Sequence, residues 1–125
     1  MPLEVTPIYA ALLTALYILL SLRVVGRRHA ARVSLGDGGD KRLLGRIRAH
    51  GNCAEYVPLC LFLLLLAELS GAPAWGLHLA GASLVAGRLA HAWALSGPGG
   101  MAFRAGGMAL TFAALILAAT LALFA

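Results

Sequence analysis

Long apolar segments, separated by short polar stretches, constrain this chain more than any other feature. The first is the uncharged run VTPIYAALLTALYILLSL, between Glu4 and Arg23. A helix needs roughly 20 apolar residues to cross a bilayer, and three further segments of suitable length follow. The chain is 61% hydrophobic and 12% charged, whereas a soluble domain has about 45–50% apolar and about 25% charged residues. We therefore expect an all-α integral membrane protein, a single four-helix transmembrane bundle over residues 1–125 with spans at about 5–25, 41–69, 75–95 and 102–124.

The positions of the basic residues predict the orientation of these spans. Arg23, Arg27, Arg28 and Arg32 follow the first apolar run, whereas a secretory signal has its positive charge before the apolar core. The first span should therefore be retained, with its basic end in the cytoplasm. The N- and C-termini would then lie outside, and the first and third loops would be cytoplasmic. The net charge of +5 lies between apolar segments, where topology signals lie, so we expect no nucleic-acid partner.

The stretch from Arg46 to Pro58, RIRAHGNCAEYVP, is the first candidate for a functional site. It is continuous with the apolar run LCLFLLLLA, so the second span must include its polar residues. At about 100° per residue, Arg48, Asn52 and Glu55 fall within an arc of roughly 60°, and Tyr56 lies at its edge. Polar groups in or near a membrane are costly and persist where they face a partner, a cavity or a ligand.

Antiparallel spans would bring further polar residues to the same level. Arg88 and His91 share one face of the third span, because they are three residues apart, and Arg104 lies in the first turn of the fourth span. Together with the stripe on the second span they would form one layer, with Arg28 or Arg32 above it. Glu55 is the single acidic residue of this layer. Buried positive charge is unfavourable unless an anion or water offsets it, so the layer predicts a pocket for a small anion.

The remaining motifs predict structure rather than chemistry. Cys53 and Cys60 are seven residues apart on one expected helix, about 10 Å along its axis, which is too far for a disulfide. His50 and Cys53 supply too few ligands for a closed zinc site, so we expect no metal. The segment VSLGDGGDKR should be a solvated connector, since glycine and aspartate favour turns. Asp40 is expected to cap a second helix that begins near Lys41, and Ser96 to Gly100 to form the last turn.

The stretch RIRAHGNCAEYVP, followed downstream by GRLAHAWAL and FRAGG, resembles the MAPEG family, the membrane-associated proteins in eicosanoid and glutathione metabolism. It looks most like the bacterial branch. The resemblance covers nearly the whole chain, because it includes the span count, the basic first loop and an arginine in each of the last three spans. It implies a four-helix transmembrane fold that forms homotrimers in a bacterial inner membrane. It also implies that glutathione, as cosubstrate, is held between subunits on the cytoplasmic side.

The resemblance further implies roles for individual residues. By motif position, Glu55 would receive the amino group of glutathione, while Arg48 and Asn52 would hold carboxylate and backbone groups. Arg104 would stand near the sulfur and lower the pKa of the thiol, which makes it the candidate catalytic residue. The candidate glutathione-binding residues are Arg28, Arg48, His50, Asn52, Glu55, Tyr56, Arg88 and His91.

Three functions remain open at this point. The first is a glutathione-dependent transferase or peroxidase acting on lipophilic small molecules that arrive from the surrounding membrane lipid. Eicosanoid-forming members carry tyrosines on the third helix, where this chain has His91 and Leu95, so the lipophilic acceptor is not identified. The second is a catalytically silent member that binds glutathione. The third is a small multidrug exporter, which would need a membrane-embedded carboxylate for proton coupling.

Overall fold

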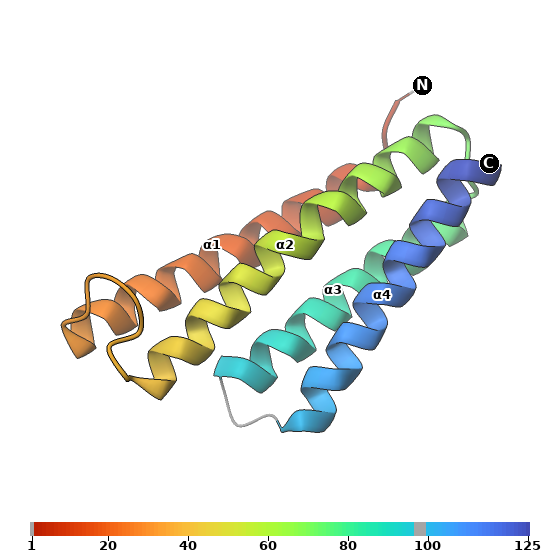
Figure 1. Ribbon diagram of the computed structural model, residues 1–125. Helices are drawn as coiled ribbons and strands as arrows, with labels where there is room; N and C mark the ends of the chain where they lie inside the picture. Colours follow the sequence, from red (N-terminus) through yellow and green to blue (C-terminus); the bar gives the residue numbers. More distant parts are fainter. Residues whose placement is uncertain (1, 97–99) are drawn as a thin grey trace.

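A computed structural model of the protein describes residues 2–96 and 100–125. Four α-helices account for most of these residues, namely α1 (Thr6–Ala31), α2 (Lys41–Leu69), α3 (Ala74–Ser96) and α4 (Met101–Phe124). Successive helices run in opposite directions, so both chain termini lie at one end of the bundle, which we call the terminal end (Figure 1). The other end carries the α1–α2 loop, the end of α3 and the start of α4, and we call it the basic end. This arrangement confirms the predicted all-α, four-helix architecture.

The helices form two hairpins that pack on each other. The most extensive contact is between α3 and α4, and α2 contacts the other three helices. In the described part of the chain, α1 contacts α2 and α3 but not α4. Polar residues from α2, α3 and α4 can therefore meet inside the bundle, whereas α1 covers one side of it.

The first loop begins where the sequence predicts, at the segment VSLGDGGDKR, directly after the Arg32 C-cap of α1. The α1 helix extends beyond the expected span, which ends near residue 25, and it ends at Ala31, where Arg32 adopts a left-handed conformation with φ of 57°. The extra turns contain arginines, which are good helix formers. The α2 helix begins at Lys41, and the Asp40 side chain accepts a hydrogen bond from the Leu43 backbone N–H at 2.7 Å. This confirms Asp40 as the N-cap. The expected turn from Ser96 to Gly100 lies largely outside the described residues.

A carboxylate from α2 anchors the start of α1 at the terminal end. Glu68 accepts hydrogen bonds from the backbone N–H groups of Glu4, Val5 and Thr6, at 3.0, 2.7 and 2.9 Å. The first N–H groups of a helix have no partner within the helix and carry a partial positive charge. Glu68 therefore supplies the acceptor that α1 lacks in its own N-cap, Val5.

Small residues allow α3 and α4 to approach closely. Gly87 and Gly107 face each other, and a Cβ atom added to either would lie 2.7 Å from the backbone oxygen of the other. Thr111, which is buried, lies beside Gly87. Close packing of this kind holds membrane helices together. The hydrophobic effect does not favour association of helices that are already surrounded by lipid, so van der Waals contact between them matters more.

Most of the outer surface is apolar. Leu19, Phe62 and Ile116 are among the large hydrophobic side chains that are more than half exposed. Among the described residues, α1, α2 and α4 are long and apolar enough to cross a membrane. The α3 helix has 23 residues but carries Arg88 and His91, which are buried inside the bundle. The exposed apolar surface fits a lipid environment, and the chain is an integral membrane protein.

Candidate functional site

Arg88 lies at the centre of the polar residues inside the bundle. Its side chain is 2% exposed. It donates from Nη1 to Asn52 Oδ1 at 2.5 Å and from Nη2 to the Met108 sulfur at 3.7 Å, and its guanidinium carbon lies 5.9 Å from the centre of the Tyr56 ring. Its Nε is buried and has no hydrogen-bond partner among residues 2–96 and 100–125. All three of these contacts are uncharged, so none of them offsets the positive charge of Arg88.

Side chains from α2 and α4 hold Arg88, which belongs to α3, in place. Asn52 and Tyr56 are one turn apart on α2, and the Tyr56 ring packs edge-on against Phe112 of α4 with centroids 5.7 Å apart. A buried cation loses several kcal/mol of hydration that neutral partners restore only in part. Hydrogen bonding to Asn52 and contact with an aromatic face are two such partial compensations.

His91 lies one turn beyond Arg88, toward the basic end. It is 3% exposed, and Gly107 of α4 packs directly against it, since a Cβ at Gly107 would lie 2.7 Å from the His91 backbone nitrogen. The positive charges of Arg88, Arg104 and Arg48 all act on His91. The expected layer thus brings arginines from α2, α3 and α4 near one buried imidazole.

Three members of the expected layer lie on its outer surface. Arg48, Glu55 and Arg104 are exposed. Within the described part of the chain, none of their side chains forms a hydrogen bond or ion pair. Glu55 therefore does not neutralise the arginines, and its carboxylate and the guanidinium groups of Arg48 and Arg104 are available to a ligand or to another protomer.

Two candidate ligand residues have other contacts in the single chain. The His50 ring packs against Tyr17 of α1, with centroids 4.8 Å apart, so it lies on the α1 side of α2. Arg28 donates from Nη1 to the backbone oxygens of Val33 and Gly36, at 3.4 and 2.8 Å. It holds the first loop, and it also lines an open cavity of about 420 Å³ at the end of α1.

An apolar groove runs along the bundle between α1 and α2. Its volume is about 350 Å³, and Leu13, Tyr17, Cys53 and Val57 are among its lining residues. A second depression, of about 390 Å³, lies between α3 and α4 beside Phe103. Both are open at the side, so an apolar molecule dissolved in the bilayer has direct access to them.

Besides Arg104, α4 contributes Met108 and Phe112 to the site, and these two residues were not predicted from the sequence. Met108 contacts Arg88, and Phe112 contacts Tyr56. Both residues follow Arg104 at steps of four, which places them on the same face of a helix. That spacing was visible in the sequence and could have identified them.

Two comparisons with known proteins agree with this architecture. The model of the MAPEG family matches residues 6–124. Two curated proteins, both named inner membrane protein YecN, from Escherichia coli K12 and Escherichia coli O6:H1 CFT073, are each 40% identical to this chain over 113 residues. The matched region covers 90% of this chain and 86% of each relative.

Proposed function

Because the chain belongs to the MAPEG family, we propose that it is a glutathione-dependent transferase or peroxidase of the bacterial inner membrane that acts on lipophilic electrophiles. Glutathione is the cosubstrate, and it binds at the basic end, on the cytoplasmic side. The N- and C-termini, at the terminal end, then lie outside, and the first and third loops are cytoplasmic.

The surplus of positive charge at the basic end is the observation that carries this proposal. Arg88 is buried with neutral partners, Arg48 and Arg104 are exposed without partners in the described chain, and Glu55 offsets one charge at most. A ligand with more negative than positive groups would balance this set. Glutathione has two carboxylates and one ammonium group, and it gains a third negative charge when its thiol ionises.

The contact between Arg88 and Asn52 prepares Asn52 for ligand binding. A guanidinium group only donates hydrogen bonds, so the Asn52 atom that faces Arg88 must be the amide oxygen. The amide NH2 group of Asn52 is then free to donate to a carboxylate or peptide oxygen. Arg48, one turn away, would pair with a carboxylate, and Glu55 would accept from the ammonium group. Tyr56 and His91 would fix the position of Arg88, which itself would stabilise the bound anion.

Arg104 would act on the sulfur. A cation near a thiol in a water-poor site lowers the thiol pKa, and the thiolate is the reactive nucleophile. In the transferase reaction a new carbon–sulfur bond forms, the leaving group departs with its electron pair, and the thiol proton passes to solvent. Arg104 is exposed in the single chain. A homotrimer, in which the ligand lies between two protomers, would give it a buried environment and would bring Arg28 or His50 of one protomer near the ligand.

The test uses the purified protein in detergent micelles. Glutathione binding is measured by calorimetry, and turnover is measured with a chloronitrobenzene and with an organic hydroperoxide. The matched variants are Arg104→Ala and Lys41→Ala, which each remove one exposed positive charge at the basic end. A one-unit rise in the thiol pKa reduces the thiolate fraction about tenfold when most of the thiol is protonated. We therefore expect Arg104→Ala to lower turnover by about tenfold or more with little change in affinity, and Lys41→Ala to change neither.

The outcomes separate the alternatives. Glutathione binding without turnover toward any electrophile would refute the enzymatic proposal and favour a silent glutathione-binding member. Absence of both binding and turnover in the folded protein would refute the glutathione site itself. Native mass spectrometry of the same samples tests the homotrimer.

A further inference from the structure

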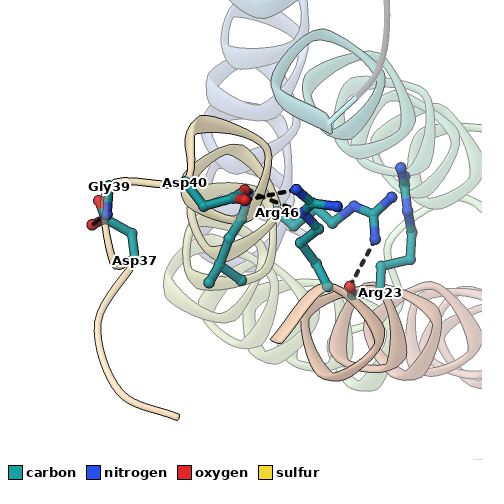
Figure 2. Close-up of polar contacts among 7 residues, drawn as sticks. Arg23, Asp37, Gly39, Asp40 and Arg46 are labelled. Carbon is teal, nitrogen blue, oxygen red and sulfur yellow. Dashed lines mark hydrogen bonds and ion pairs between the residues drawn. The ribbon is translucent and has the colours of Figure 1, made fainter. Parts of the chain in front are cut away.

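A second cluster of arginines lies where α1 and α2 meet at the basic end. It contains Arg23 and Arg27 from α1 and Arg42 and Arg46 from α2, and the negative charge of Asp40 also acts on Arg46. Figure 2 shows that the guanidinium groups of Arg23 and Arg46 lie next to each other between the two helices. None of the four belongs to the proposed glutathione site.

The carboxylate of Asp40 is already paired with Arg27 and with the first turn of α2. It accepts from Arg27 Nη2 at 2.6 Å and from Arg27 Nε at 3.2 Å, and it also accepts the backbone N–H of Leu43 (Figure 2). These contacts, the one with Arg27 above all, hold the pKa of Asp40 at about 2, so the group is ionised at neutral pH. Its charge is matched by Arg27. The other acidic residue of the loop, Asp37, accepts the backbone N–H of Gly39 at 2.9 Å.

The protein offsets the positive charge of Arg46, and satisfies its hydrogen-bond donors, only in part. Its Nη1 donates to the backbone oxygen of Arg23 at 3.1 Å. Its Nε is buried and finds no acceptor within residues 2–96 and 100–125. The positive charges of Arg23, Arg42 and Arg27 all act on it, against the single negative charge of Asp40. Like charges this close favour the recruitment of an anion.

The position of the cluster indicates the kind of anion. Arg23 is the first charged residue after the apolar run of α1, so it marks the level at which hydrocarbon gives way to headgroups. Leu22 and Val25, on either side of it in sequence, are 61% and 49% exposed. A ligand in this region would therefore contact guanidinium groups and apolar side chains together. A phospholipid matches both, because its phosphate can pair with the guanidinium groups and its acyl chains can pack against the apolar side chains.

We propose that this seam is a binding site for the phosphate of an anionic phospholipid, with Arg46 at its centre and Arg23 and Arg42 beside it. Arginine suits this role because its planar group can bind phosphate through two parallel hydrogen bonds. A lipid whose headgroup also carries an ammonium group is disfavoured, since that group would meet the surplus of positive charge. Binding of the lipid also ties α1 to α2, because the arginines come from both helices.

The experiment measures which lipids the protein retains. Native mass spectrometry is performed on protein released from micelles that contain equal amounts of phosphatidylglycerol and phosphatidylcholine. Arg46→Gln and Arg42→Gln test the cluster, and Arg32→Gln is the control, because it removes an exposed arginine at the same end but outside the cluster. We expect the wild type and the control to retain phosphatidylglycerol preferentially. Each cluster variant should lose roughly fivefold of this preference, since one basic residue near the surface contributes about that factor.

Further arms identify the source of the anion and guard against misfolding. Inorganic phosphate, added at high concentration, should displace little of the bound lipid, and full displacement would reassign the site to a free anion and refute the lipid proposal. Equal retention of both lipids by the wild type, or an equal loss in the Arg32→Gln control, would also refute it. Arg42 is exposed in the first turn of α2, so Arg42→Gln keeps the test valid if Arg46→Gln unfolds. Glutathione binding should be unchanged in all folded variants, which separates this proposal from the proposed function.

Discussion

Two adjacent glycines in α4 are expected to respond in opposite ways to the same substitution. Gly107 packs into α3, and a Cβ added there would lie 2.7 Å from the Gly87 backbone oxygen and 2.7 Å from the His91 backbone nitrogen. Ordinary contact begins at 3.4 Å, so the deficit is about 0.7 Å. The opposing atoms belong to the backbone of a helix and cannot rotate away. Gly106, by contrast, has nothing within 4 Å of its added Cβ.

The structure sets the size of the difference. Overpacking of this kind costs about 1–3 kcal/mol, whereas replacing glycine by alanine inside a helix gains up to about 1 kcal/mol. Gly107→Ala should therefore lower the free energy of unfolding by up to about 2 kcal/mol, and Gly106→Ala should raise it by up to about 1 kcal/mol. Gly107→Ala should also weaken glutathione binding, because separation of α3 from α4 moves His91 and the arginines around it.

The measurement is unfolding of both variants in mixed micelles of dodecylmaltoside and dodecyl sulfate, followed by far-ultraviolet circular dichroism. The comparison is internal, since the two variants have identical composition and differ in position by one residue. Equal stability of the two variants would refute the close α3–α4 crossing on which the argument depends. A less stable Gly106→Ala would show that this outward face of α4 packs against something other than lipid.

Further predictions concern the polar contacts at the two ends of the bundle. Glu68→Gln weakens the anchor at the start of α1 and should lower the unfolding free energy by about 1 kcal/mol in the same micelle assay; an unchanged value would contradict the anchoring role. Asp40 has a lowered pKa of about 2. Its contact with Arg27 therefore stabilises the fold fully at pH values above about 3.9, the pKa of aspartate in the unfolded chain. This stabilisation is lost as the pH falls toward 2. The Asp40→Asn variant should lack this acid-dependent loss in a pH titration of thermal stability, and a wild-type-like titration would contradict the pairing. Tyr9 has its hydroxyl 2.9 Å from His78 Nδ1, so Tyr9→Phe should cost about 1 kcal/mol, and an equally stable variant would show that this contact is not formed.

The order and the ends of the helices could be predicted from the sequence because charge marks them. Charged or turn-forming residues interrupt the apolar runs, so the start of α2 after Asp40 followed from local chemistry. The first span was expected to end near residue 25, where the arginines begin, and α1 continues beyond it to Ala31. Arginine ends the hydrocarbon region without ending the helix. The helix continues into the headgroup layer until Arg32 turns the chain.

The placement of Arg88 and Asn52 at the same level of the bundle could be predicted from the antiparallel directions of the helices alone. Antiparallel helices of similar length bring the start of α2 beside the end of α3, and both residues were already assigned to the same level. The contacts of Glu68 with the start of α1, and of Gly107 with His91, could not be predicted in this way. They depend on how each helix is rotated about its axis, and this rotation is set by packing between small side chains that no local pattern reports.

The α1–α2 hairpin is fastened at both of its ends. At one end Glu68 of α2 accepts hydrogen bonds from the first backbone N–H groups of α1. At the other end Arg27 of α1 pairs with Asp40, and Arg46 of α2 donates to the backbone oxygen of Arg23. Contacts at both ends oppose sliding of α1 along α2 and separation of the ends of the two helices. The groove beside Tyr17 and Cys53 lies between these two sets of contacts, at mid-length, and it is open at the side of the hairpin. An apolar molecule would thus reach the groove from the side of the hairpin, between the two sets of contacts that hold its ends together.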